Sequence, residues 1–334
     1  MPVRLGRSDV RISRFGLGGA QLGNLYAPID DDQALATVAA AWDAGVRYFD
    51  TAPHYGLGLS EQRLGRALRE HDRADYVLST KVGRLLVPAT TAGDDMGHGF
   101  AVPATHRRRW DFSRDGVLRS IEQSLERLDV STVDVVFIHD PDNHYRSALR
   151  EAFPALAELR AQGMIGAVGV GMNQWEMLTD FVRETDMDVV MLAGRYTLFE
   201  QPALDVLLAE CVDRGVSVIA AGVYNSGLLA RARADAHSRY NYVRASPDVM
   251  RRANRIAAVC ERHGVTLPEV AIQFPLGHPA VAGIVIGAAT PEHVRDNMAR
   301  MGAQVPARLW ADLRAEGLLH HAAPAPTGPQ VASR

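Results

Sequence analysis

The sequence has few cysteines, no long apolar run and no excess of positive charge. Its two cysteines, Cys211 and Cys260, lie in segments with a helical pattern, so no set of disulfides defines the fold. No apolar run reaches the roughly 20 residues that a helix needs to cross a bilayer. The net charge of -3 gives no electrostatic footprint for nucleic acid. With no signal-like pattern at its start, the chain is expected in the cytoplasm, with neither a nucleic-acid nor a membrane partner.

Lysine is almost absent. Of the 36 lysine and arginine residues, 35 are arginine, and Lys81 is the only lysine. Arginine cannot be deprotonated and cannot act as a compact ammonium with an adjustable pKa. Codon bias can leave a single lysine by chance, but Lys81 ends an apolar strand, and perturbed cations cluster at active sites. The pattern favours a functional lysine.

Length and composition predict one large globular domain. The chain has 334 residues, 47% of them hydrophobic and 22% charged, and no break in composition divides it. We expect residues 1–321 to form this domain. The tail at 322–334 has too little apolar material for a core and is predicted to be disordered.

Strand and helix patterns alternate along the chain. A hairpin is expected over residues 1–11 and a first strand over Ile12–Gly19, followed by a helix with Asp30 as N-cap and Gly45 at its end. Further helices are predicted at Gln62–Glu70, Arg114–Leu128, Ser147–Ala161, Trp175–Glu184, Ala203–Arg214 and Pro291–Met301, with two more within 248–277. Further strands are predicted to begin at Arg47, Tyr76, Val133, Ile165, Asp188, Val216 and Val281. Eight strand-helix alternations predict a (β/α)8 TIM barrel.

Ionisable residues end three of the apolar strands. In V-R-Y-F-D-T-A-P-H-Y-G the strand ends at Asp50, and Tyr55 follows five residues later. The next two such strands end at Lys81 and His139. Because active sites of these barrels lie at the carboxyl ends of strands, we expect the four side chains to meet in one pocket. Asp50 or Tyr55 alone has a structural explanation, as an ion-pair partner or a loop aromatic, but the four together indicate catalysis.

Two other segments have distinctive patterns. The connection from Gly83 to Phe112 is far longer than an ordinary loop between a strand and a helix, and we expect it to cover the pocket. Its run Arg107 to Arg109 is typical of an exposed charged segment, and Arg84 is likewise expected to be solvated. The glycines at 18 and 19, which end the first strand, would let the backbone approach a ligand, although they do not open a helix as in a dinucleotide fingerprint.

The four strand-end groups predict proton transfer. A phenol with a pKa of about 10 is a poor base near neutral pH unless a cation favours the phenolate. Lys81 supplies that cation, Asp50 holds the ammonium charged, and His139 can hydrogen-bond the substrate oxygen. Together they move a proton on or off a hydroxyl or carbonyl oxygen. Hydride transfer with a nicotinamide cofactor needs this arrangement and neither a nucleophile nor a metal.

The motifs that carry these residues resemble the aldo-keto reductase family. They are F-D-T-A-P-H-Y-G, S-T-K-V-G, the isolated His139 and the late G-A-A-T-P-E-H-V-R-D-N, and the resemblance covers residues 3 to about 318. It implies the barrel, an NAD(P) cofactor and an Asp/Tyr/Lys/His catalytic tetrad. The segment I-H-D-P-D and a missing phosphate-binding lysine are most similar to the sugar dehydrogenases that act on L-fucose and D-threo-aldoses.

The resemblance also implies a cofactor site, with departures from the family pattern. Asn173 stands for the usual Ser-Asn pair, Ala193 replaces a glutamine and Ala221 replaces a tyrosine. Gly287 and His293 occupy positions that commonly hold the 2′-phosphate through lysine and arginine, which slightly favours NAD over NADP. The implied cofactor residues are Gly18, Gly19, Asp50, Asn173, Ala193, Ala221, Tyr224, Ser226, Gly227, Gly287, Thr290, His293 and Asn297.

The function that this resemblance implies is oxidation of an aldose at its anomeric carbon to the lactone. One alternative is a general aldehyde or ketone reductase, or a pyridoxal-type dehydrogenase, on the same scaffold; another is a non-enzymatic nicotinamide-binding regulator. A sugar needs several hydrogen-bonding groups, and the candidate substrate residues are mostly polar. They are His54, Trp110, Asp140, Asn143 and His144, with Arg195 and Asn225 as further candidates. The sequence identifies neither the sugar nor the oligomeric state.

Overall fold

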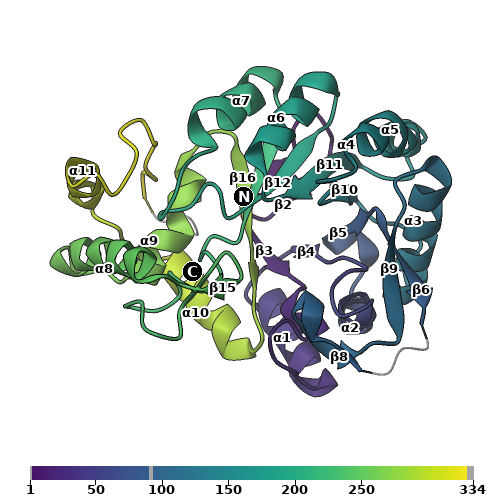
Figure 1. The fold of residues 1–334 in the computed structure, drawn as a ribbon, viewed down its shortest axis with the longest axis horizontal. Helices are drawn as coiled ribbons and strands as arrows, with labels where there is room; N and C mark the ends of the chain where they lie inside the picture. The colour runs from purple at the N-terminus through teal and green to yellow at the C-terminus, as the bar shows by residue number, and fades with distance from the viewer. Residues whose placement is uncertain (1, 90–92, 329–334) are drawn as a thin grey trace.

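The computed structural model describes residues 2–89 and 93–328, and its centre is a closed barrel of parallel strands. The strand order around the barrel is β10-β11-β12-β13-β16-β3-β4-β5. The strands are β3 (Phe15–Gly18), β4 (Tyr48–Asp50), β5 (Val77–Val82), β10 (Val135–His139), β11 (Ala167–Met172), β12 (Val189–Ala193), β13 (Ser217–Ala221) and β16 (Val281–Gly287). Helices surround them (Figure 1), which confirms the predicted (β/α)8 fold.

The helices follow the predicted pattern closely. The bounds of α3 (Arg114–Leu128), α6 (Trp175–Glu184) and α10 (Pro291–Met301) are those expected, whereas α2 (Leu59–Leu68) begins three residues before the predicted start. The helices after β10 and β12 each contain a turn of π-helix, at Ala148–Ala152 and Leu204–Leu208. The remaining helices are α1 (Asp31–Asp43), α4 (Tyr145–Ser147), α5 (Phe153–Ala161), α7 (Ala209–Arg214), α8 (Pro247–Arg262), α9 (Leu267–Gln273) and the unpredicted α11 (Ala307–Ala315).

The N-terminal hairpin closes the amino end of the barrel. Strands β1 (Val3–Arg4) and β2 (Arg11–Ile12) pair antiparallel, as predicted. Ile12 pairs with Val3 in this hairpin, so the first barrel strand begins at Phe15 and not at Ile12. The Gly6 amide donates to Ser217 Oγ at 2.7 Å, which ties the hairpin to the first residue of β13.

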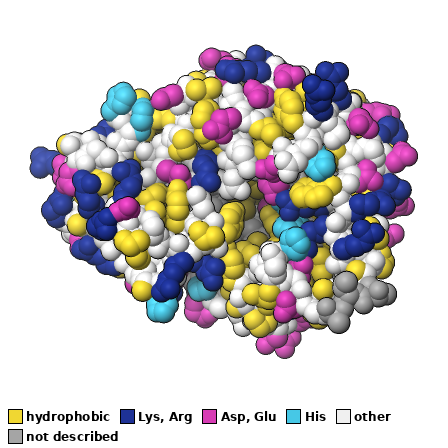
Figure 2. Space-filling view, viewed as in Figure 1, with side chains coloured by type: hydrophobic (Ala, Val, Ile, Leu, Met, Phe, Trp, Pro, Cys, Tyr) yellow, Lys and Arg dark blue, Asp and Glu magenta, His cyan; other side chains and the backbone are white. Residues whose placement is uncertain are grey.

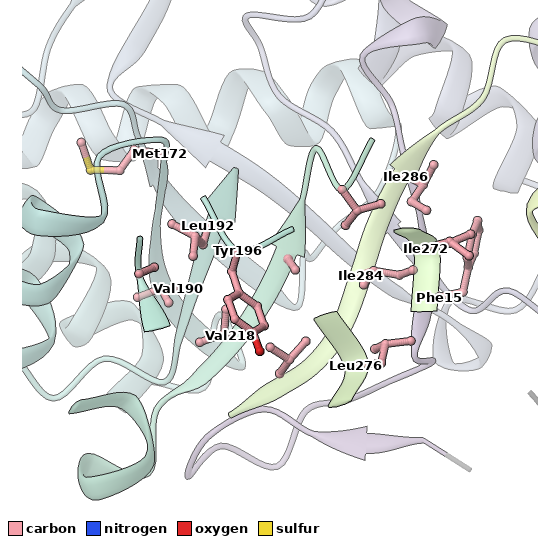
Figure 3. Packing of buried hydrophobic residues seen from close by; sticks show 14 of the residues in the cluster. Phe15, Met172, Val190, Leu192, Tyr196, Val218, Ile272, Leu276, Ile284 and Ile286 are labelled. Atoms are coloured by element: carbon pink, nitrogen blue, oxygen red, sulfur yellow. The ribbon is translucent and has the colours of Figure 1, made fainter. Parts of the chain in front are cut away.

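Alternation along the strands builds two apolar layers. Val135 and Phe137 of β10 belong to an interior cluster with Leu5 of the hairpin, while Val136 and Ile138 belong to the layer between the strands and the helices. Figure 3 shows part of that outer layer, with Ile284 of β16 near Ile272 and Leu276 and with Val190 and Leu192 of β12 at the opposite side of the view. Since β10 alternates in this way, His139 continues the inward row at its carboxyl end.

The connection between β5 and α3 is long, as predicted, and it contains two antiparallel ribbons. Strand β6 (Arg84–Pro88) pairs with β9 (His106–Trp110), and β7 (Asp94–Asp95) pairs with β8 (Phe100–Pro103). A regular ribbon satisfies its own backbone hydrogen bonds, so it holds side chains in fixed directions.

The predicted tail begins with residues that contact the domain. Arg314 Nη2 donates to the carbonyl oxygen of Ala323 at 2.7 Å, and Ala323 is buried. Residues 329–334, the rest of the predicted tail, lie outside the described residues. Within the described chain, no helix combines the length and the apolar character that crossing a membrane requires.

Candidate active site

Three adjacent strands bring the predicted catalytic residues to one end of the barrel. Asp50 is the last residue of β4, Lys81 the next-to-last of β5, and His139 the last of β10. Strand β5 pairs with β4 on one side and with β10 on the other. Lys81 therefore lies between the two other groups, as expected for the carboxyl ends of a parallel barrel.

Asp50 and Lys81 form a buried ion pair. Lys81 Nζ donates to Asp50 Oδ2 at 2.6 Å and to the carbonyl oxygen of Thr51 at 2.9 Å, and the two side chains are 2% and 3% exposed. The other carboxylate oxygen accepts from Ser79 Oγ at 2.7 Å, a contact that the sequence analysis missed. Burial alone would lower the pKa of Lys81, but Asp50 and the neighbouring Tyr55 outweigh burial and raise it. The lysine is thus held as an ammonium.

Tyr55 lies directly above this ammonium, in the turn after β4. The Lys81 Nζ atom is 4.7 Å from the centroid of the Tyr55 ring. Burial raises the pKa of Tyr55 to about 12, although the charge of Lys81 and its hydrogen bond act in the opposite direction. The phenol is therefore protonated near neutral pH, with a cation positioned to stabilise its ionised form.

His139 completes the cluster as a neutral imidazole. Its ring centroid is 5.9 Å from that of Tyr55, with the two planes 89° apart. Burial lowers the pKa of His139 well below the usual value, and the charges of Arg84 and Lys81 lower it further. A neutral imidazole can donate one hydrogen bond to a substrate oxygen without carrying charge into the site.

A polar pocket of about 350 Å³ lies beside His139. Four of the five predicted substrate residues line it, together with Asn173, which was predicted to bind cofactor. Its full lining is Arg84, Trp110, Asp140, Asp142, Asn143, His144, Asn173 and Gln174. His54 is not part of this lining. Figure 2 shows the face hollowed near its middle, with basic and histidine side chains at one side of the hollow.

Arg84 is a pocket residue, so the expectation that it is solvated was wrong. Its side chain is 11% exposed, and its guanidinium donates to Asp140 and lies 4.5 Å from the centroid of the Trp110 ring. Arg84 Nε is buried without a hydrogen-bond partner among the described residues. The backbone of Asp140 has a φ of 42°, a left-handed conformation that is uncommon outside glycine. In the sequence, the signal that Arg84 belongs to the site was its position three residues after Lys81.

Arg195 and Asn225, the two further substrate candidates, lie elsewhere. Arg195 Nη1 donates to Glu200 Oε1 at 3.1 Å, and Asn225 Nδ2 donates to the same oxygen at 3.0 Å. Neither is among the residues that line the pocket. Both side chains are held by the Glu200 carboxylate, which explains their positions without any contact to a substrate.

The predicted cofactor residues form two groups near the ends of later strands. In the first, Asn173 Nδ2 donates to the carbonyl oxygen of Ala193 at 2.8 Å, and Ala221 lies next to Ala193 in the β12–β13 register. In the second, the Tyr224 hydroxyl donates to Asn297 Oδ1 at 3.0 Å.

Four more of the predicted cofactor residues have local structural roles. Thr290 caps α10 by accepting from the His293 amide at 3.2 Å. Ser226 Oγ accepts from the Tyr242 amide at 3.0 Å, and Gly227 has a φ of 91°.

The three other predicted glycines are explained by packing. A Cβ at Gly287 would lie 1.7 Å from Gln21 Oε1, one at Gly19 would lie 2.5 Å from Ser60 Oγ, and one at Gly18 would meet Val285. At Gly19 the added Cβ would also lie 2.9 Å from the Asp50 carbonyl oxygen, so this position needs glycine whether or not a ligand binds.

Comparison with known proteins places this geometry in a family. The sequence model of the Aldo/keto reductase family matches residues 14–315. The D-threo-aldose 1-dehydrogenase of Pseudomonas sp is 45% identical over 310 residues, 92% of this chain and 94% of that protein. The pyridoxal 4-dehydrogenase of Microbacterium luteolum is 38% identical over 334 residues, 94% of this chain and 97% of that protein. The solved structure of a glycerol dehydrogenase from Gluconobacter oxydans shares the fold, with a TM-score of 0.73, 23% identity and 99% of both chains covered.

Proposed function

The chain belongs to the aldo/keto reductase family, and from this premise we propose that it oxidises the anomeric carbon of an aldose to the lactone. Family membership makes it an oxidoreductase. The buried Lys81–Asp50 pair beneath Tyr55, next to His139, is the observation that carries the proposal. We expect the enzyme in the cytoplasm, acting on a small molecule.

Each of the four clustered side chains has a distinct role in the proposed reaction. Tyr55 in its deprotonated form, a phenolate that Lys81 stabilises, accepts the proton of the anomeric hydroxyl and becomes a phenol. Asp50 keeps Lys81 charged, and His139 donates a hydrogen bond that orients the reacting oxygen. A bound nicotinamide cofactor would supply the acceptor for the hydride that leaves the anomeric carbon.

The pocket supports a sugar as the substrate. Its lining offers a carboxylate in Asp140, a guanidinium in Arg84 and amides in Asn143, Asn173 and Gln174. Hydroxyl groups need both donors and acceptors, and a site built from both kinds rejects analogues that lack them. The D-threo-aldose 1-dehydrogenase relative agrees with this chemistry.

The residues also fit a nicotinamide dinucleotide. The ends of β12 and β13 carry only Ala193, Gly194, Ala221 and Gly222, so a flat ring can approach the backbone. Asn225 Oδ1 nearby is a buried acceptor without a partner among the described residues, which a ligand amide can satisfy. Asn173, Tyr224, Ser226, Thr290, His293 and Asn297 would hold the rest of the cofactor.

We propose that NAD⁺ serves at least as well as NADP⁺. Gly287 has no side chain, and the space where one would lie is filled by Gln21. Neither Gly287 nor His293 supplies the permanent cation of a lysine or arginine for the 2′-phosphate. Steady-state kcat/KM values for the two cofactors check this, and a large preference for NADP⁺ would overturn it.

A substrate panel tests the proposed function. Nicotinamide absorbance is followed with L-fucose and other aldoses, with pyridoxal, and with apolar aldehydes. We expect the aldoses to give the highest kcat/KM. Pyridoxal as the best substrate would instead favour the activity named for the 38% identical relative.

A further inference from the structure

Arg108 differs from the arginines on either side of it. On β9, Arg107 and Arg109 are exposed, while the Arg108 side chain is 6% exposed, as is its partner Asp95. Arg108 Nη1 and Nη2 donate to the two carboxylate oxygens of Asp95 at 2.7 and 2.5 Å. The prediction that this run is uniformly exposed was wrong, because alternate residues of a strand point to opposite faces.

The buried guanidinium contacts His54, next to Tyr55. Arg108 Nε donates to His54 Nδ1, and Nη2 donates to the His54 carbonyl oxygen at 3.0 Å. Arginine has only donors and stays charged in proteins. His54 Nδ1 must therefore be the acceptor, and the hydrogen of the neutral ring must lie on Nε2.

The His54 ring lies among the catalytic groups. Its centroid is 6.1 Å from that of Tyr55 and 5.7 Å from that of His139. Among the described residues, His54 Nε2 has no hydrogen-bond partner, yet it is not one of the buried unpaired atoms. It is therefore open to a small molecule or to solvent.

We propose that Arg108 is a positioning residue, which fixes the Nε2–H tautomer of His54 so that this ring donates a hydrogen bond to a substrate oxygen next to the reacting one. The substrate part of this inference rests on the proposed function. The tautomer part does not.

The same contact prevents His54 from acting as a cation. A proton on Nδ1 would face the Arg108 N–H group, so two donors would meet. Burial lowers the pKa of His54 far below its usual value, and the nearby charges of Arg84 on β6, Arg108 on β9, His98 after β7 and Lys81 on β5 lower it further. The other titratable groups near the ring are Tyr55, His139 and, through Arg108, Asp95. His54 thus stays a neutral donor across about pH 5 to 8, where an ordinary histidine titrates.

Nuclear magnetic resonance on the wild-type protein tests the tautomer. In a protein with 15N-labelled histidine, His54 is assigned among the 12 histidines as the signal lost in His54→Gln. We expect its Nδ1 to have the shift of an unprotonated nitrogen and its Nε2 that of a protonated one. A protonated Nδ1 would overturn the proposal, whatever the enzyme's substrate.

Kinetics tests the effect on the reaction. With the best substrate found, we expect Arg108→Met to raise KM about tenfold, with a smaller change in kcat, because one oriented hydrogen bond is lost. In 15N-labelled Arg108→Met, the two His54 nitrogens should have the shifts of a mixture of tautomers, because no donor then faces Nδ1. Arg109→Met, from the exposed face of the same strand, is the matched control and should change neither quantity. An unchanged KM together with an unchanged His54 tautomer in folded Arg108→Met would overturn the positioning role.

Discussion

The Lys81 ammonium and the Asp50 carboxylate determine how the phenol beside them behaves. Lys81 has two acceptors within 2.9 Å and almost no contact with solvent. Its charge is therefore fixed, and it acts on Tyr55 at short range in a region of low effective dielectric. The pKa of Tyr55 alone would make it a poor base, and the charge of Lys81, held by Asp50, is what favours its deprotonated form.

Replacing Tyr55 by phenylalanine removes the proposed proton acceptor and little else. We expect turnover to fall by roughly 100-fold or more, the range for loss of a general acid-base group, with cofactor affinity nearly unchanged. Tyr145→Phe is the matched control, since that hydroxyl donates to Glu184 at 2.7 Å on the outside of the barrel. Initial-rate assays measure the turnover, and fluorescence titration with the cofactor measures the cofactor affinity. Near-normal turnover in Tyr55→Phe would exclude this mechanism.

The raised pKa of Tyr55 predicts the direction of the pH dependence. A phenol with a pKa of about 12 is protonated at all ordinary pH values, and oxidation needs the deprotonated form. The kcat/KM for oxidation should therefore rise as pH increases from about 7 to 10. Initial rates at low substrate concentration measure it. A rate that falls over this interval would show that another group is the base.

At the scale of the elements, α2 and α3 are held together by two ion pairs of very different burial. Glu61 on α2 is fully buried and accepts from Arg127 Nε at 2.6 Å and from Thr80 Oγ1 at 2.7 Å. Arg69 and Asp129, at the carboxyl ends of the same helices, form a pair whose side chains are 61% and 68% exposed. The same two helices thus offer an internal comparison.

Removing the cation from the buried pair should destabilise the protein strongly. Arg127→Met leaves the Glu61 charge buried without its partner, and we expect a loss of about 3 to 5 kcal/mol in the free energy of unfolding. Arg69→Met removes only an exposed pair and should cost less than about 1 kcal/mol. Urea denaturation followed by circular dichroism measures both. Equal effects of the two substitutions would contradict this account of how α2 docks.

The helices and strands that were predicted correctly from the sequence are those whose bounds depend on local patterns. The bounds of α3 follow from the Ser113 cap and apolar spacing, and those of α6 follow from apolar spacing alone. Asp50 and His139 were found because each ends an apolar run. The ribbons between β5 and α3 were missed, because their pairing joins residues far apart and leaves no periodic signal in a short window.

Where the burial of a side chain depends on such pairing, the sequence predicted it wrongly. Arg84 and Arg108 look like surface residues in the sequence, and only their partners Asp140 and Asp95 show otherwise. These partners lie on different segments, which the fold brings together. The same holds for Ser79, which supports Asp50 from the neighbouring strand.

At the scale of the whole molecule, Lys81 reports on the integrity of the barrel. It is the only lysine, and its side chain is 2% exposed. An amine-selective reagent should modify the chain terminus at once and Lys81 only when the barrel opens, so the Lys81 rate should match the rate of global unfolding. Mass spectrometry after timed labelling, with urea to raise the unfolding rate, measures this. Labelling of Lys81 at the rate of the terminus in native buffer would show that the site is open.

The N-terminal hairpin lies at the amino end of the barrel, tied to β13 through Ser217, while the pocket lies beside His139 at the carboxyl end. Among the described residues the single lysine is enclosed, so coupling through amines is directed to the start of the chain, next to this hairpin. A support that couples through amines should therefore attach every molecule at the closed end. Each immobilised barrel would then present its pocket to the solution, without any engineered tag.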